Sequence, residues 1–169
     1  VKGAKLYILN ENQEVMESWT SGDQPHYVEK LPIGTYTLLE ETAPKGYIVA
    51  NKVTFEIKDT GDIQGAKMED EQAMGKVILN KTDKDTKKPM KGVEFALCDS
   101  KGKVLETLVT DSAGHAESNN YPIATFKNGQ YKKAITYILK ETKTLDSYQL
   151  DETEHKIQFE YVNDHTPVI

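Results

Sequence analysis

Apolar and polar residues alternate along most of the chain with a period of two, and little helical periodicity is present. The alternation is clear in residues 53–57, which the turn residues 59–62 follow, and again in residues 157–163. Successive side chains of a strand point to opposite faces. Many short alternating segments separated by turn residues are typical of a β-sandwich. The sequence therefore predicts an all-β fold.

One of these strand segments occurs twice and carries a glutamate on its apolar face each time. Glu40 shares a face with Tyr36 and Leu38, and Glu141 takes the matching place in residues 137–148. A carboxylate on the same face as tyrosine and leucine is costly to bury, and this cost is typical of functional groups. Two such glutamates in equivalent places indicate one chemistry used twice.

The chain length and a second repeat favour two small domains. The chain has 169 residues, and residues 3–9 are repeated as residues 92–98. The boundary between the two repeats lies near residues 71–75, a short link that lacks proline and is not a flexible Gly/Ser tether. We therefore expect one domain over residues 1–73 and a second over residues 74–169.

Charge and composition exclude several classes of function. The chain has 27 acidic and 21 basic residues, with a net charge of −6, so it lacks the basic patch typical of nucleic-acid binding. No apolar run is long enough to cross a bilayer, and no signal peptide is visible. Cys98 is the only cysteine, and the histidines have no metal-ligand spacing. We expect no nucleic-acid partner, no membrane insertion in this segment and no metal.

Three polar residues fall at inward positions of three expected strands in the second domain: Lys81, Glu141 and Asn163. Burial disfavours the charged forms of both lysine and glutamate, so a proton can pass from Lys81 to Glu141. The neutral amine is then a nucleophile, and Glu141 can polarise the Asn163 carboxamide and shuttle the proton. The product is an amide between Lys81 and Asn163, with ammonia released. This single turnover needs no cofactor, and we do not class the protein as an enzyme.

An ordinary salt bridge is the alternative interpretation of the same three residues. Inward positions near strand ends can reach water, and strand register slips easily when alternation alone defines it. The residue pattern by itself leaves both interpretations open.

Four segments, residues 3–6, 34–40, 43–47 and 76–83, resemble the collagen-adhesin B-type (CnaB-like, SpaA/pilin-type) domains of Gram-positive surface proteins and pilins. The resemblance covers essentially the whole chain as two tandem modules. It implies two immunoglobulin-like sandwiches with a self-made Lys–Asn or Lys–Asp isopeptide bond. It also implies a structural stalk or repeat module of an extracellular, cell-wall-attached adhesin or pilus, with neighbouring domains of the same protein as partners.

The resemblance extends to named residues in both modules. In the second it implies the same roles for the three residues above. In the first it implies Glu40 as catalyst and Asp70 as acceptor. Asp59 is an alternative acceptor, because residues 156–163 also align with residues 52–59.

The first module begins at the second strand of the family pattern. Lys81 precedes Gly92, and the matching lysine of the first module would precede Val1. The resemblance therefore implies that the first module lacks its N-terminal strand here and that the chain is a piece of a longer surface protein. The open sheet edge is a site for strand donation by another molecule.

Residues 121–134 give a second hypothesis for function. Asn128 and Gly129 predict a type I′ hairpin, and the nearby aromatic residues Tyr121, Phe126 and Tyr131 could contact a ligand. The alternative function is therefore an adhesin module that recognises a host matrix protein or glycan. The competing interpretation is that these rings cover the end of their own sandwich.

Overall fold

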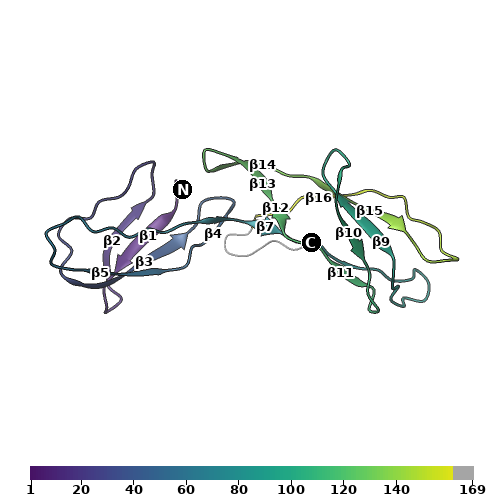
Figure 1. Cartoon of the computed structure of the whole chain (residues 1–169), viewed down its shortest axis with the longest axis horizontal. Helices are drawn as coiled ribbons and strands as arrows, with labels where there is room; N and C mark the ends of the chain where they lie inside the picture. The colour runs from purple at the N-terminus through teal and green to yellow at the C-terminus, as the bar shows by residue number, and fades with distance from the viewer. Residues whose placement is uncertain (162–169) are drawn as a thin grey trace. The chain divides into compact units, whose positions relative to one another are not determined.

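The computed structural model describes residues 1–161 and contains sixteen strands (Figure 1). No helix forms within this range, so none of these residues lies in a helix able to span a membrane. The prediction of an all-β fold is confirmed. Contacts divide the described chain into two compact units. The first comprises Val1–Ala73, Phe126–Lys132 and Tyr161, and the second comprises Met74–Thr125 and Lys133–Glu160.

The first unit is built on one four-stranded antiparallel sheet in the order β2-β1-β3-β5, with a separate short pair, β4 and β6. The strand bounds are β1 Lys5–Leu9, β2 Val15–Thr20, β3 Gly34–Thr42, β4 Tyr47–Ile48, β5 Val53–Ile57 and β6 Glu71–Gln72. The central strands β1 and β3 carry the core.

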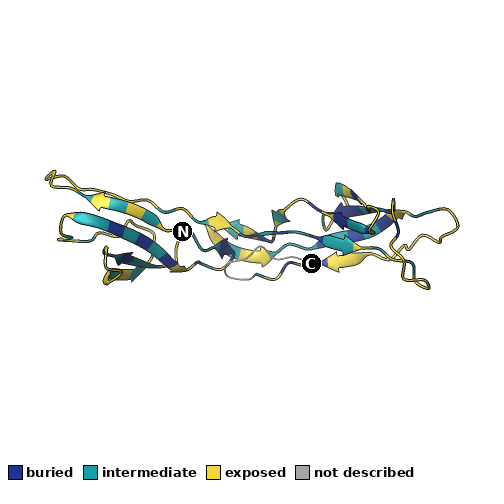
Figure 2. Cartoon of the chain, turned by 90° about the horizontal axis from the view of Figure 1, so that it is seen from below, coloured by how far each residue is buried: buried dark blue, intermediate teal, exposed yellow. Residues whose placement is uncertain are grey.

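Burial alternates along β3 as the sequence predicts. Tyr36, Leu38 and Glu40 are buried, whereas Thr37 and Leu39 between them are only partly covered (Figure 2). Several partly buried residues pack on the small core of this unit: Leu6, Trp19, Val28, Leu31, Val53, Phe55, Ile57 and Met68. The alternation places the glutamate on the core face of the sheet.

The second unit has a matching four-stranded sheet in the order β10-β9-β15-β16, and two short pairs, β8 with β11 and β7 with β12. Its strands are β7 Met74–Gly75, β8 Ile78–Asn80, β9 Glu94–Cys98, β10 Val104–Val109, β11 His115–Glu117, β12 Tyr121–Pro122, β15 Tyr137–Lys143 and β16 His155–Ile157. Its core is better covered than that of the first unit: Val93, Leu97 and Cys98 are at most 1% exposed.

The predicted hairpin within residues 121–134 is confirmed. Strands β13 (Ala124–Lys127) and β14 (Gln130–Ala134) pair with each other. Asn128 and Gly129 connect them with φ angles of 52° and 71°. Positive φ at both central residues is the requirement of a type I′ turn, which the Asn-Gly sequence meets at low cost.

The central strands of the two four-stranded sheets pair in the same way, β3 with β1 in one sheet and β15 with β9 in the other. Glu40 lies opposite Leu6 across β3 and β1, and Glu141 lies opposite Phe95 across β15 and β9. Each ladder also shifts register next to its glutamate. The glutamates are therefore structurally equivalent, as their repeated spacing predicts.

The alignment of residues 156–163 with residues 52–59 is wrong by two residues. His155 faces Leu139 in the way that Val53 faces Leu38, so residue 155 corresponds to 53 and not to 51. A shift of two residues keeps every side chain on its face. Side-chain alternation therefore could not detect the error, and this support for Asp59 as an acceptor is lost.

Gly75 offers a test of packing in the second unit. A Cβ atom at Gly75 would lie 2.3 Å from the buried Phe159 ring, so we expect Gly75→Ala to reduce the unfolding free energy by about 1–3 kcal/mol through overpacking. Thermal and urea unfolding followed by circular dichroism measure this change. Gly65→Ala is the control, because nothing lies within 4 Å of its Cβ. Equal stability of the two variants would contradict the tight contact.

Candidate functional site

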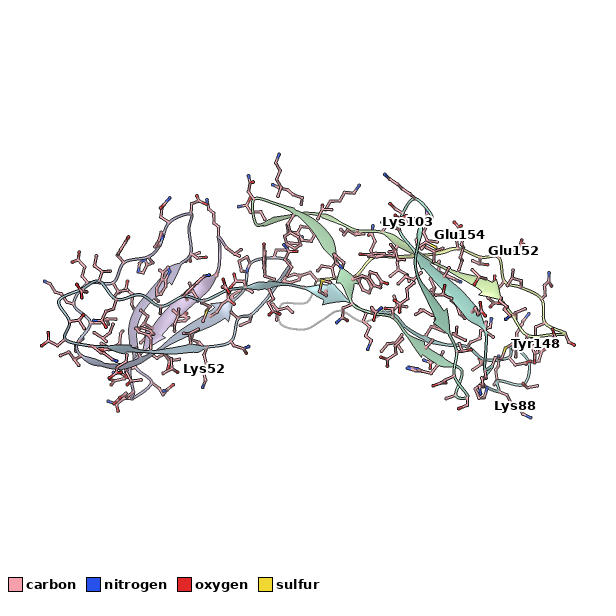
Figure 3. The ribbon with its side chains drawn as sticks, viewed as in Figure 1. Lys52, Lys88, Lys103, Tyr148, Glu152 and Glu154 are labelled. Carbon is pink, nitrogen blue, oxygen red and sulfur yellow. The ribbon has the colours of Figure 1, made fainter. Side chains whose placement is uncertain are left out.

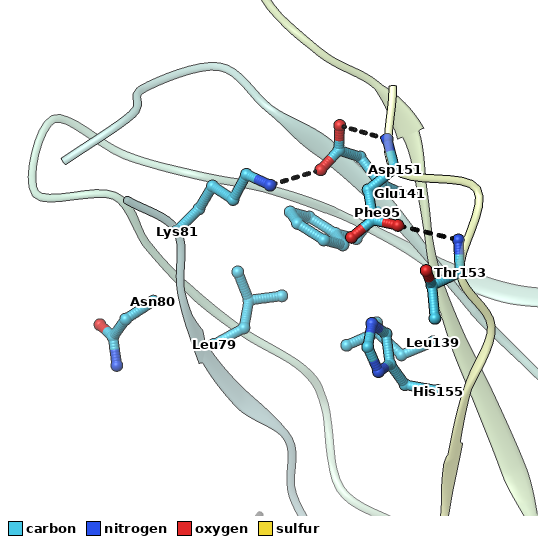
Figure 4. A pocket seen from close by; sticks show the side chains of 9 residues that line it. All are labelled: Leu79, Asn80, Lys81, Phe95, Leu139, Glu141, Asp151, Thr153 and His155. Atoms are coloured by element: carbon cyan, nitrogen blue, oxygen red, sulfur yellow. Dashed lines mark hydrogen bonds and ion pairs between the residues drawn. The ribbon is translucent and has the colours of Figure 1, made fainter. Parts of the chain in front are cut away.

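Lys81 and Glu141 meet in the second unit, as the sequence predicts. Lys81 directly follows β8, and its Nζ donates a hydrogen bond of 2.8 Å to Oε2 of Glu141 on β15 (Figure 4). The Glu141 side chain is 2% exposed and that of Lys81 is 26% exposed. The carboxylate is therefore in the dry interior, whereas the lysine side chain reaches water in part. Asn163, the third predicted member, lies outside the described residues.

The backbone of Lys81 is held from two sides. Its N–H donates to the Gly114 carbonyl at 2.7 Å, and its own carbonyl accepts from the Met90 N–H at 3.0 Å. Gly114 has a φ of +72°, and a Cβ atom there would lie 2.3 Å from the Lys81 carbonyl oxygen. Only glycine fits this approach. The result is a fixed starting point for the lysine side chain.

A tyrosine connects the turn after Lys81 to the loop that follows β15. Tyr148, labelled in Figure 3, donates its hydroxyl to Oδ2 of Asp83 at 2.6 Å. This hydrogen bond is the main reason that the pKa of Asp83 is lowered. The equivalent tyrosine of the first unit, Tyr47, is buried and bonds to the Gly129 carbonyl instead. The repeated tyrosine therefore has a different contact in each unit.

The pair borders a pocket of about 200 Å³. Its lining residues come from β8, β9, β15 and the segment leading into β16, namely Leu79, Asn80, Lys81, Phe95, Leu139, Glu141, Asp151, Thr153 and His155 (Figure 4). The pocket is large enough for a further small side chain beside the amine. This is the space that a condensation partner of Lys81 would need.

Asp151 is a pocket residue that the sequence analysis missed. Its N–H approaches Oε1 of Glu141 at 3.5 Å. Hydrogen bonds from Thr153 lower the pKa of the Asp151 carboxyl, and the positive charge of Lys81 lowers it further. Asp151 is thus an anion near the amine. Ala50 takes the same place ten residues after Glu40, but only the structure shows this equivalence.

The equivalent site in the first unit has a different electrostatic state. Glu40 is 2% exposed, and its Oε2 accepts a hydrogen bond of 2.5 Å from the Ala50 N–H. Its Oε1 is buried and has no hydrogen-bond partner within residues 1–161. None of the ion pairs in that range involves Glu40. Among residues 1–161, therefore, Glu40 has no lysine partner of the kind that Lys81 provides for Glu141.

The two candidate acceptors of the first unit differ in their surroundings. Asp70 is half-buried, and its charge acts on Glu40: burial raises the pKa of Glu40, and Asp70 raises it further. Burial also raises the pKa of Asp70. Asp59 is exposed just after β5. The structure thus places Asp70 near the glutamate and Asp59 in solvent.

Within the described range, no group of three or more histidine, cysteine or acidic side chains could hold a metal ion. His115 contacts Asn80 and Glu117, and His155 lines the pocket described above. Cys98 is a buried free thiol.

Residues 1–72 and 75–168 each match the family described as SpaA: Prealbumin-like fold domain. The chain belongs to this family. Its two compact units are therefore tandem SpaA-type units of the prealbumin-like, immunoglobulin-like class. No curated protein matches the chain in sequence.

Solved structures of Gram-positive proteins are similar to the two SpaA-type units. The Bacillus anthracis TIE protein has a TM-score of 0.66 and 25% identity over 100% of this chain, which spans 30% of that structure. The shaft pilin SpaA of Lactobacillus rhamnosus GG has a TM-score of 0.41 and 15% identity over 99% of this chain and 85% of its own. The T6 backbone pilin of Streptococcus pyogenes has a TM-score of 0.43 and 15% identity, covering 76% of this chain and 26% of that one.

Opposite pKa shifts at Glu40 and Glu41 give the first unit a testable pH dependence. Burial raises the pKa of Glu40 in the folded state. The protonated glutamate therefore contributes fully to the free energy of unfolding below the pKa of the unfolded chain, about 4.3. This contribution is lost as the pH rises through the higher pKa of the folded state. We expect Glu40→Gln to flatten this decline. Urea unfolding at several pH values, followed by the fluorescence of Trp19, measures it. Trp19 is the only tryptophan and lies in β2 of this unit.

Glu41→Gln is the matched control on the opposite face of the same strand. Hydrogen bonds from Lys5 and Tyr7 lower the pKa of Glu41, so its contribution is present above the unfolded pKa and is lost as the pH falls through the lowered folded value. This variant should therefore lose stability at neutral pH and keep the decline due to Glu40. The same pH profile in both variants would contradict the assignment.

Proposed function

We propose that the chain is a structural module of a Gram-positive surface protein or pilus, and that its second unit is cross-linked by a self-made isopeptide bond. The observation that carries this proposal is the 2.8 Å contact between the Lys81 amine and the buried Glu141 carboxylate. Membership of the SpaA-type family supports it. The module is extracellular and attached to the cell wall through its parent protein, and its partners are neighbouring domains of that protein.

The proposed reaction joins Lys81 to Asn163 with Glu141 as the acid–base catalyst. A proton moves from the Lys81 ammonium to Glu141 across their hydrogen bond, and the free amine attacks the Asn163 carboxamide carbon. The protonated Glu141 first donates a hydrogen bond to the carboxamide oxygen and then gives its proton to the leaving nitrogen. The attacking nitrogen gives up its extra proton to the Glu141 carboxylate. One C–N bond forms, one C–N bond breaks, and ammonia leaves. The geometry supports this role, because the Glu141 carboxyl lies in the dry interior in direct contact with the amine.

The cross-link would join the start and the end of the second unit. By the loop-entropy estimate used for disulfides, closing a loop of this length stabilises the unit by about 4–5 kcal/mol. A force along the chain would then pass through covalent bonds and would not separate the sheets. An amide also resists reduction, unlike a disulfide. These properties suit a segment that bears mechanical load.

In the first unit the proposal assigns the catalytic role to Glu40 and the acceptor role to Asp70, with Asp59 as the second choice. The raised pKa of both Glu40 and Asp70 supports this order, because a protonated aspartate is the form that condenses with an amine. The reaction would release water and needs a lysine. No described lysine pairs with Glu40.

The aromatic residues of the ligand-binding hypothesis contact other parts of the protein. Tyr121 packs on Tyr137 with ring centroids 5.7 Å apart and donates its hydroxyl to Glu106 at 2.8 Å. Phe126 and Tyr131 pack on each other. These contacts favour the covering role of the rings, and recognition of a host matrix protein or glycan stays a hypothesis without a site.

Intact-mass measurement tests the cross-link directly. We expect the purified chain to be lighter than its sequence mass by one ammonia, and the deficit to vanish in Lys81→Ala and in Glu141→Ala. Lys88→Ala, which removes an exposed lysine, should keep the deficit. A full sequence mass would contradict the bond. A deficit of one water would instead indicate an aspartate acceptor, for which Asp151 is the carboxylate in the pocket.

Single-molecule stretching tests the mechanical role. We expect the second unit to resist extension in the intact chain and to unfold with a new step in Lys81→Ala, since the covalent path is then broken. The step from the first unit, which has no described lysine partner for Glu40, should be the same in both proteins. Equal extension of the two proteins would argue against a load-bearing cross-link.

A further inference from the structure

The edge strands β2 and β10 carry a glutamate in equivalent places. Each edge strand pairs with the central strand beside it, and each ladder shifts register by one residue immediately before the glutamate. Glu17 of β2 then lies opposite the buried Ile8, and Glu106 of β10 lies opposite the buried Leu97. Such bulges re-aim side chains at sheet edges. The two carboxylates therefore point to the core side of their own sheets.

Each glutamate holds a later segment of its own unit, but the donors differ. Glu106 accepts hydrogen bonds from the Asn119 N–H at 3.0 Å and from the Tyr121 hydroxyl at 2.8 Å. Burial and the contact with Glu106 raise the pKa of Tyr121 to about 12, so both donors keep their protons at neutral pH. Glu17 instead contacts Nε2 of His26 at 3.2 Å. Histidine is the side chain that gains and loses its proton between pH 5 and 8.

A second contact fixes the His26 ring. It stacks on Trp19, with ring centroids 4.3 Å apart and planes inclined by 10°. Trp19 lies two residues after Glu17 on β2 and packs on the core of the first unit. A cation over the face of a tryptophan is attracted to the ring, and a charged N–H donor binds a carboxylate more strongly than a neutral one. Both contacts therefore favour the protonated histidine.

Glu17 is the carboxylate that responds to the charge of His26. Within residues 1–161, the ion pair with Glu17 is the only one that contains His26. The other charged side chains of residues 21–33 and of the core face of the sheet are exposed or are bonded elsewhere: Asp23, Glu29, Lys30 and Glu40.

We propose that His26, Glu17 and Trp19 form a pH-sensitive clasp that fastens residues 21–33, the connection after β2, to the core face of the first unit. Protonated His26 binds both partners and holds Val28 and Leu31 of this connection against the core. Loss of the proton weakens both contacts, so the connection opens more often and uncovers Trp19. The clasp is independent of the isopeptide bond proposed for the second unit.

The expected change is modest because water reaches the clasp. The side chains of His26 and Glu17 are 32% and 37% exposed. An ion pair that water screens to this degree changes an opening equilibrium by roughly two- to fivefold. This change affects the local opening of one connection and leaves the sheet itself intact.

The fluorescence of Trp19, the only tryptophan, tests the clasp in the native chain. A protonated imidazole stacked on an indole quenches its emission, so we expect the emission to rise as the pH increases from 5 to 8. His26→Gln keeps an amide donor that does not titrate and should remove this transition, and Glu17→Gln should move it to lower pH. Glu40→Gln should retain it, which separates the clasp from the stability change assigned to Glu40.

Hydrogen exchange measures the opening of the connection itself. Comparison with His26→Gln at the same pH cancels the intrinsic pH dependence of exchange. We expect the protection of residues 21–33 in the unaltered chain, relative to this variant, to be roughly two- to fivefold higher at pH 5 than at pH 8. Glu106→Gln is the matched control in the second unit and should leave this ratio unchanged.

Three results would overturn the clasp. The first is an emission of Trp19 that does not change between pH 5 and 8, and the second is a transition that persists in His26→Gln. The third is a fluorescence transition without a change in the exchange of residues 21–33, because His26 would then titrate without fastening the connection. The mass deficit of the second unit is measured separately, so either proposal can fail alone.

Discussion

A carboxylate on the core face of a strand needs a cation or a proton, and this requirement governs both units. Strand alternation places Glu40 and Glu141 among apolar side chains, and the same register against the neighbouring strand holds them there. Glu141 obtains the Lys81 ammonium at 2.8 Å. Glu40 pairs with no lysine in the described chain, and burial raises its pKa.

The two units therefore present the same scaffold in two electrostatic states. In the second, the amine, the carboxylate and a pocket of about 200 Å³ lie together, which is the arrangement that the proposed condensation needs. In the first, Glu40 pairs with no described lysine, and the charge of Asp70 adds to the effect of burial in raising the pKa of Glu40.

Much of the fold follows from residue order. The alternation of Tyr36, Leu38 and Glu40 is the burial pattern observed on β3, and the Asn-Gly pair forms the turn it predicts. The register of β16 does not follow, because a shift of two residues leaves every face unchanged. The partial exposure of Lys81 was also not predicted: alternation gives the direction of a side chain but not how near the end of the sheet it lies.

Sequence periodicity alone was sufficient to identify the all-β class and the two inward glutamates, because these depend on local geometry with a period of two. The tandem repeat followed from segments that occur twice. The packing of distant segments decided which polar residues lie around Glu141 and Glu40. Asp151 enters the pocket through a loop whose path no local pattern specifies, and Asp70 acts on Glu40 across the fold. Long-range contacts of this kind are set by how strands stack and pair, since the energy of a buried charge depends on every neighbour it meets.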